Sequence, residues 1–154
     1  MHQLAQLNIA HLLEPIDSPR LAPFVAALDE VNAVADTAPG FVWRLQSESG
    51  NATDVRPWGE HVIVNLSVWE SVQALHDYVF GPVHAAVLRQ RRQWFAPPAT
   101  AHLVLWWVPS GHRPELDEAG ERLARLERSG PGPAAFTLRK PYPAPPGRSG
   151  SAPA

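Results

Sequence analysis

The sequence predicts a single α+β domain whose core has the element order β-α-β-β-α-β, followed by one further helix. Two observations predict this class. Stretches in which apolar and polar residues alternate are typical of half-buried strands, and between them lie stretches with apolar residues at helical spacing. The 154 residues are about the length of one domain. We expect this domain to span residues 1–140 and the Pro/Gly/Ser/Ala-rich remainder, 141–154, to be a disordered tail.

The first part of the chain contains two predicted strands and a helix. Alternation over residues 3–11 predicts the first strand. A Ser-Pro pair at 18–19 supplies an N-cap and a first-turn proline, so a helix is expected from there to about residue 37. A Pro-Gly pair at 39–40 ends this helix, and renewed alternation over 41–46 predicts the second strand.

The middle of the chain begins with a segment that lacks regular periodicity. Residues 47–60 are rich in Gly, Asn, Asp, Ser and Pro, which favours a long hairpin loop in which Trp58 acts as a lid or an anchor. Alternation over 61–69 predicts the third strand. Two helical pieces follow, over 70–80 and 83–94, because a Gly-Pro pair interrupts the pattern between them.

The last part of the chain contains a strand and a helix. Residues 101–108 are nearly all apolar, which predicts a strand that is covered on both faces. Pro114 opens a helix that has acidic residues in its first turn and arginines near its end, an arrangement that complements the helix dipole. A Gly-Pro pair at 130–131 ends this helix, and a short edge strand is expected at 135–139.

This order is the ferredoxin-like, split βαβ arrangement, in which helices cover one face of a four-stranded antiparallel sheet. In the first three strands, apolar and polar residues separate onto opposite faces. We expect the helices to pack on the apolar face and to leave the polar face uncovered. That polar face carries Gln6, Asn8, Arg44, Gln46, Asn65, Ser67 and Trp69, and the fourth strand adds His102 and Trp106. Because exposed tryptophans are uncommon without a partner, a binding cavity is favoured there over a solvated surface.

Composition argues against several classes of function. The chain has no cysteine, so a disulfide framework, a thiolate metal site and a cysteine nucleophile are excluded. The net charge is −2 and the basic residues are dispersed, which argues against a nucleic-acid partner. The apolar runs are far shorter than a membrane span, and the first residues do not resemble a signal peptide. We therefore expect a cytoplasmic protein with no membrane partner. His61, His76 and His102 have no partners at metal-ligand spacing, so no metal site is expected.

Four segments, 41–45, 65–71, 84–95 and 105–109, together resemble an uncharacterised bacterial domain family. The resemblance covers about residues 4–143. That family is placed in the dimeric α/β-barrel superfamily, alongside the antibiotic-biosynthesis monooxygenases. The resemblance implies a dimeric α/β-barrel fold and a homodimer, and it implies no particular reaction because none is established for the family.

Two wider groups of the superfamily suggest chemistry. In its cofactor-independent, quinone-forming monooxygenases, an Asn and a Trp lie close together on one strand of the cavity and a Tyr follows on the next helix; Asn65, Trp69 and Tyr78 look similar. In its haem-degrading monooxygenases, an Asn lies in the first strand and a haem-ligating His follows the central helix; Asn8 and His84 are in comparable places. The first resemblance implies no cofactor, and the second implies haem.

These considerations define a set of candidate site residues. We expect Asn65, Trp69 and His84 to be catalytic, with the Asn65 amide donating hydrogen bonds to an oxyanion and the indole packing on an aromatic ring. The predicted substrate-binding residues are Asn8, Trp43, Arg44, Ser67, Tyr78 and Trp106. Each has a structural alternative. In that alternative, Asn65 and Trp69 line the barrel without a chemical role, and His84 only bonds a neighbour in the first turn of a helix.

A basic cluster on the second helical region, Arg89, Arg91 and Arg92, has two interpretations. These side chains either clamp an acidic substrate or form a solvated helix face, and the solvated face is favoured. For the chain as a whole, we expect a protein that binds a small molecule. The leading activity is a cofactor-independent monooxygenase or isomerase acting on an aromatic metabolite; the alternatives are a haem-binding protein and a non-catalytic binding or sensor module.

The Asn65/Trp69 face, and not a metal at His84, is expected to carry the chemistry. Strand alternation forces Asn65, Ser67 and Trp69 onto one face together. By contrast, no residue near His84 in the sequence is an obvious partner to fix its tautomer.

Overall fold

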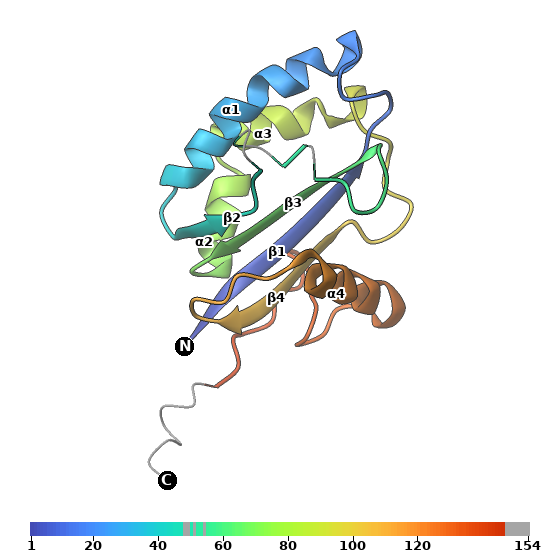
Figure 1. Cartoon of the computed structure of the whole chain (residues 1–154). Helices are drawn as coiled ribbons and strands as arrows, with labels where there is room; N and C mark the ends of the chain where they lie inside the picture. Colours follow the sequence, from blue (N-terminus) through green and yellow to red (C-terminus); the bar gives the residue numbers. More distant parts are fainter. Residues whose placement is uncertain (48–49, 51, 54, 147–154) are drawn as a thin grey trace.

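The four strands of the computed structural model form one antiparallel sheet in the order β2-β3-β1-β4 (Figure 1). The structure describes residues 1–47, 50, 52, 53 and 55–146. Its strands and helices are β1 (His2–His11), α1 (Ala22–Thr37), β2 (Phe41–Arg44), β3 (Val62–Trp69), α2 (Val72–Val79), α3 (Pro82–Arg89), β4 (Leu103–Pro109) and α4 (Leu116–Ser129). Short 3-10 turns, Pro19–Leu21 and Arg91–Gln93, precede α1 and follow α3. This element order and strand order confirm the predicted ferredoxin-like α+β class and its extra helix.

Local sequence explains the turn into β2 and the start of α2. The chain turns into β2 at Gly40, whose φ of +82° favours glycine and whose added Cβ would lie 2.5 Å from the Cβ of Ala74. Helix α2 begins at a capping serine, because the Oγ of Ser71 accepts a hydrogen bond from the Ala74 amide at 3.1 Å. Helix α3 ends at Arg89, earlier than the predicted helix over 83–94.

Helices cover both faces of the sheet: α1, α2 and α3 lie on one side and α4 lies on the other (Figure 1). The face toward α4 is apolar. It forms one buried cluster in which Ala119 and Leu126 of α4 pack with Ala5, Leu7, Val64, Leu66, Val68, Val104, Trp106 and Val108. The opposite face carries Trp69, which packs with Leu75 of α2. The prediction that the polar face would be left uncovered is therefore wrong, because the apolar stripe of α4 occupies the apolar face and the first three helices cover the polar one.

The segment after α4 completes the edge of the sheet. Phe136 and Leu105 exchange two backbone hydrogen bonds at 2.8 and 2.9 Å, a single bridge at the place where a short edge strand was predicted. The indole of Trp107 donates to the carbonyl of Tyr142 at 2.9 Å, and the Tyr142 hydroxyl donates to the Pro131 carbonyl at 3.3 Å. Contacts with the folded part thus reach Tyr142, two residues after the predicted boundary at residue 140. Residues 147–154 of the predicted tail lie outside the described residues.

The long β2–β3 connection is attached to α4 through Trp58. A Cβ added to Gly120 would lie 2.9 Å from the indole ring of Trp58, so glycine is needed for the close approach of ring and helix. Of the two roles expected for Trp58, this contact matches the anchor. Across the described part of the chain, no helix is both long and apolar enough to span a membrane.

Candidate functional site

A cavity of about 1060 Å³ lies mainly between the polar face of the sheet and helices α1, α2 and α3, and it extends to Leu126 of α4 and to Pro131, Thr137, Leu138 and Arg139 after α4. Its floor is formed by strand residues that include Gln6, Asn8, Asn65, Ser67 and Trp69. Its roof is formed by side chains of the three helices, among them Phe24, Leu28, Val31, Tyr78, Val79, His84, Val87 and Leu88. A cavity with an apolar roof and a few polar groups on its floor is typical of small-molecule sites.

The register of the strands brings the polar side chains of the floor together. Ser67 of β3 lies opposite Gln6 of β1 on one side and opposite Arg44 of β2 on the other. One pair further along, Asn65 lies opposite Asn8. Since directly opposed residues in an antiparallel pair point to the same face, five polar residues from three strands meet on the floor.

Hydrogen bonds link four of the floor residues into a network, which leaves two donor groups available to a ligand. The Gln6 amide Nε2 donates to Asn65 Oδ1 and, at 2.8 Å, to Ser67 Oγ, which also accepts from Trp69 Nε1 at 2.9 Å. Two acceptances fill both lone pairs of the Ser67 hydroxyl, so its own hydrogen is left to donate. Among the described residues, the Asn65 amide Nδ2 has no protein acceptor. The floor therefore offers an amide donor and a hydroxyl donor to a bound molecule.

One wall of the cavity is an aromatic ladder that runs from the sheet to α3. The rings of Trp69 and Tyr78 stack with centroids 5.0 Å apart, and the ring of Tyr78 meets that of His84 edge-on at 5.1 Å. The Tyr78 hydroxyl donates to the Val31 carbonyl of α1 at 3.2 Å. Burial raises the pKa of Tyr78 to about 12, so its phenol stays protonated under ordinary conditions.

His84 is held in one tautomer by the backbone. Its Nδ1 lies 3.2 Å from the Val79 carbonyl, which can only accept, so Nδ1 carries the hydrogen and Nε2 keeps its lone pair. Burial lowers the pKa of His84 below its ordinary value, which keeps the ring neutral at neutral pH. The group that fixes this tautomer is a backbone carbonyl five residues upstream, which the residue types around His84 do not indicate. A neutral imidazole with a free Nε2 is suited to act as a base or a ligand.

Arg44 has a structural role in addition to lining the cavity. Its Nε and Nη2 donate to the two carboxylate oxygens of Asp36 at 2.7 and 3.2 Å, and Nη1 donates to the Gly50 carbonyl at 2.7 Å. These bonds connect β2 to the end of α1 and to the β2–β3 connection. Asp36 also balances the charge of the guanidinium.

A family model described as a domain of unknown function, DUF3291, matches residues 3–151 of this chain. The chain belongs to the DUF3291 family. This confirms the resemblance to an uncharacterised family that segments 41–45, 65–71, 84–95 and 105–109 indicate. Among curated proteins, none has a sequence that matches this DUF3291 chain.

Solved structures that this DUF3291 chain is similar to share little sequence with it. SnoaB, a cofactor-independent oxygenase from Streptomyces nogalater, is 15% identical over 75% of this chain and 100% of its own, with a TM-score of 0.46. Protein NE2512 of unknown function from Nitrosomonas europaea is 13% identical over 75% and 95%, with a TM-score of 0.47. Rv0793 from Mycobacterium tuberculosis is 13% identical over 73% and 99%, also with a TM-score of 0.47. These similarities assign no activity to the DUF3291 chain.

The cavity brings together most of the predicted site residues of this DUF3291 domain. Those that line it are Asn8, Arg44, Asn65, Ser67, Trp69, Tyr78 and His84. Trp43 and Trp106 lie instead on the α4 side, where Trp106 donates to Glu118 Oε2 at 2.9 Å and the Arg113 guanidinium lies 6.0 Å from the ring centre of Trp43. Trp106 and His102 were expected on one face because they are four residues apart in a predicted strand. Strand β4 begins only at Leu103, so strand alternation does not apply to His102, and His102 lines the cavity while Trp106 does not.

Gln6 is the polar residue whose importance the sequence argument missed. It was placed on the polar face but not among the site residues, although it is the donor that joins Asn65 to Ser67. Its position opposite Ser67 is set by the strand register, which the sequence does not give. The predicted face residue Gln46 lies beyond the end of β2 and does not line the cavity.

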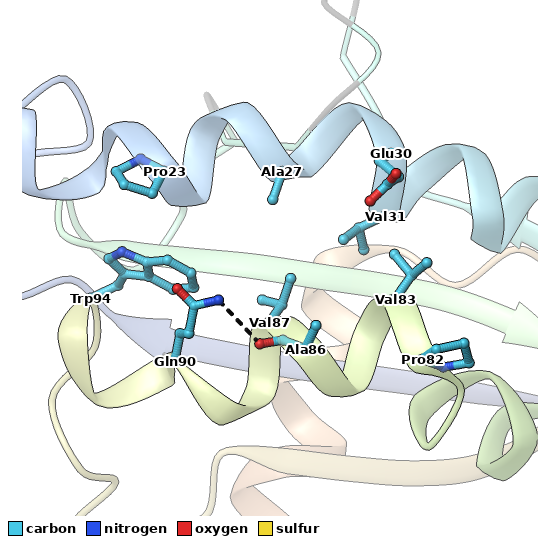
Figure 2. A pocket seen from close by; sticks show the side chains of 10 residues that line it. All are labelled: Pro23, Ala27, Glu30, Val31, Pro82, Val83, Ala86, Val87, Gln90 and Trp94. Atoms are coloured by element: carbon cyan, nitrogen blue, oxygen red, sulfur yellow. Dashed lines mark hydrogen bonds between the residues drawn. The ribbon is translucent and has the colours of Figure 1, made fainter.

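A second hollow of about 370 Å³ lies between α1 and α3 (Figure 2). In Figure 2, Ala27 and Val31 of α1 face Val83, Ala86 and Val87 of α3. Three of these five, Ala27, Val31 and Val87, also line the large cavity, so they separate the two spaces. The hollow contains no group comparable to the hydrogen-bond network or to His84, so the large cavity is the candidate site.

Proposed function

We propose that this DUF3291 protein binds a small, largely aromatic molecule with an oxygen function in the cavity, and that His84 exchanges a proton with it. The observation that carries the proposal is the shared lining of one cavity by a neutral imidazole and by the free donors of Asn65 and Ser67. The three groups come from β3 and α3, which are linked through α2: the ring of Tyr78 in α2 packs against Trp69 of β3 and against His84 of α3.

The walls suit an aromatic ligand. Tyr78, with the almost fully buried Trp69 packed behind it, supplies ring surface for stacking, and the apolar side chains of α1 and α3 supply contacts for the remainder of a ring system. Burial of apolar surface would provide most of the binding free energy, while the floor donors would fix the orientation of the ligand.

The polar groups suit the formation of an enolate or a phenolate. His84 Nε2 would accept a proton from a carbon or oxygen next to a conjugated carbonyl, and the negative charge that develops on oxygen would be met by the Asn65 amide and the Ser67 hydroxyl. Return of the proton to another carbon gives an isomer. With dioxygen as the oxidant, a C–O bond forms at the deprotonated carbon; loss of one oxygen atom as water then converts a methylene into a carbonyl.

Haem binding is a second candidate, favoured by the His84 geometry alone. An imidazole whose Nδ1–H is held by a carbonyl and whose Nε2 is free fits the donor requirement of a haem iron. Bound haem would supply redox chemistry at the metal, and His84 would position it. The two candidates are separated by whether purified protein titrates with haem to give a Soret band that is lost in His84→Ala and kept in Asn65→Ala.

The homodimer and the cytoplasmic location stay predictions. The homodimer rests on the resemblance to dimeric α/β barrels. Because both faces are covered by helices of the same chain, a dimer would use another surface or displace α4. Light scattering at micromolar concentration measures the state directly.

The proposed proton transfer is tested with 1,8-dihydroxyanthrone, in which two aromatic rings flank a methylene. We expect Trp fluorescence quenching on binding, and dioxygen uptake with appearance of the quinone on turnover. Asn65→Ala should slow turnover by about a hundredfold, since a donor to the developing charge is lost. The control is Gln73→Ala, because Gln73 lies exposed on α2 and bonds Asp77. Binding without turnover would contradict the proposed proton transfer and favour a non-catalytic binding module. If neither this compound nor other polycyclic phenols bound, the proposal as a whole would be contradicted.

A further inference from the structure

Among the described residues that line the cavity, arginines and histidines occur but acidic residues do not. These residues are Arg44, His84, Arg91, His102 and Arg139; no aspartate or glutamate is among them. The chain as a whole has 15 acidic and 13 basic residues, so its composition does not explain this bias. The cavity is therefore more cationic than the protein that contains it.

The three arginines differ in how their charge is balanced. Arg44 is paired in bidentate fashion with Asp36. Arg91 donates from Nη1 to the Leu88 carbonyl at 2.7 Å, a neutral acceptor. Within the described part of the chain, neither Arg91 nor Arg139 has a carboxylate partner. Two arginines thus line the cavity with charges that no described acid neutralises.

Arg44 and His84 lie with the aromatic ladder, whereas Arg91 and His102 lie toward the other end of β1. Trp69 is opposite Leu4 near the start of the strand. Arg91 comes one turn before Phe95, which forms a bridge with Leu12 beyond the end of the strand. The carbonyl of His102 accepts from the Ile9 amide. At a rise of about 3.3 Å per residue, five strand residues separate the two ends by roughly 16 Å.

We infer that the molecule bound in the cavity is an aromatic carboxylate, with its rings toward the Trp69/Tyr78 ladder and its carboxylate at Arg91 and Arg139. This deepens the proposed function and rests on it. Guanidinium groups bind carboxylates through paired charge-assisted hydrogen bonds, and an uncompensated arginine beside an apolar cavity favours an anionic ligand. Since both arginines are exposed, screening by salt limits the gain.

The neighbouring arginines provide a matched control. Arg89 and Arg92 flank Arg91 in sequence and carry the same charge, but neither lines the cavity. If Arg91 strengthened the binding of an anion only through the overall positive charge of this region, replacing Arg89 and Arg92 would weaken binding to the same extent. All three arginines are exposed, as the favoured interpretation from sequence predicts, and Arg91 differs from the other two in that it also lines the cavity.

The experiment compares 1-hydroxy-2-naphthoate with its methyl ester, which has the same rings and hydroxyl but no charge. By calorimetric titration at low salt, we expect the acid to bind about tenfold more tightly than the ester. In Arg91→Gln/Arg139→Gln, the acid should weaken to the affinity of the ester, and the ester should be unchanged. In Arg89→Gln/Arg92→Gln, both affinities should stay as in the wild type.

Two results would overturn the inference while leaving the proposed function in place. One is equal affinity of acid and ester in the wild type. The other is survival of the preference for the acid in Arg91→Gln/Arg139→Gln. Failure of both probes to bind the wild type, together with failure of 1,8-dihydroxyanthrone, would instead contradict the proposed function itself.

Discussion

The indole Nε1 of Trp69 donates a hydrogen bond of 2.9 Å to the Oγ of Ser67, two residues earlier on the same strand face. This bond fixes the plane of a ring that is almost fully buried and that forms one wall of the cavity. The same oxygen accepts a hydrogen bond from the Gln6 amide, so the Ser67 hydroxyl orients both the Trp69 ring and the Gln6 side chain.

Ser67→Ala should destabilise the fold by about 1–3 kcal/mol, because the buried N–H of Trp69 and one N–H of Gln6 would lose their acceptor. Urea unfolding followed by circular dichroism measures the change in the free energy of unfolding. Ser110→Ala is a suitable control, since Ser110 is exposed after the end of β4. A loss below about 0.5 kcal/mol in Ser67→Ala would show that the network does not support the fold.

Two of the buried tryptophans, Trp69 and Trp106, should respond differently to substitution by phenylalanine. Both are almost inaccessible to solvent, so each change should reduce stability by roughly 1–3 kcal/mol. Only Trp69 lines the cavity, whereas Trp106 bonds Glu118 on the other side of the sheet. Titration with the naphthoate methyl ester should therefore show several-fold weaker binding in Trp69→Phe and wild-type affinity in Trp106→Phe. The reverse pattern would place the site on the α4 side.

Tyr78 should make the protein sensitive to alkali. The unfolded chain releases the Tyr78 proton near pH 10, its ordinary value, whereas burial raises the native pKa to about 12. Between these values the unfolded state binds fewer protons than the native state, so stability falls as pH rises. Below pH 10 both states are protonated and this contribution is constant. Urea midpoints at pH 9 and pH 11 should differ less in Tyr78→Phe than in the wild type; equal differences would contradict the assignment.

The C-terminal boundary can be located by two truncations. A chain that ends after Tyr142 keeps the carbonyl that accepts from Trp107 and the ring that packs beside Phe136, so its melting temperature should match that of the full chain. A chain that ends after Lys140 loses both contacts and should melt about 2–6 °C lower. Differential scanning calorimetry measures both. Equal melting temperatures for the two truncations would support the predicted boundary at residue 140.

Strand alternation allowed the members of the site to be predicted, but not the layer in which they lie. The period of two correctly grouped Gln6, Asn8, Asn65 and Ser67, because it depends only on pleating. Which helices cover that group depends on whether α4 or the first three helices pack on the apolar face of the sheet. In the structure α4 packs there. A sequence gives the hydrophobicity of each helix but not the outcome of such a competition.

Two further features depended on contacts between residues distant in sequence or on backbone atoms. The bond between Gln6 and Ser67 needs the register of two strands separated by more than fifty residues. The tautomer of His84 is set by a main-chain carbonyl, whose position follows from the break between α2 and α3. Residue types carry little information about either, whereas the helix interruption at Gly81 itself was predicted.

The floor and the roof of the cavity are attached to the molecule in different ways. The floor is made by β1 and β3, each of which is paired along both edges in the order β2-β3-β1-β4. The roof includes α3, none of whose side chains is fully buried, and α2, in which only Leu75 is. Amide hydrogens of the floor should therefore exchange with solvent only when the whole domain unfolds, while those of α2 and α3 exchange by local opening. A ligand can be admitted and released by movement of the roof without any loosening of the groups that recognise it.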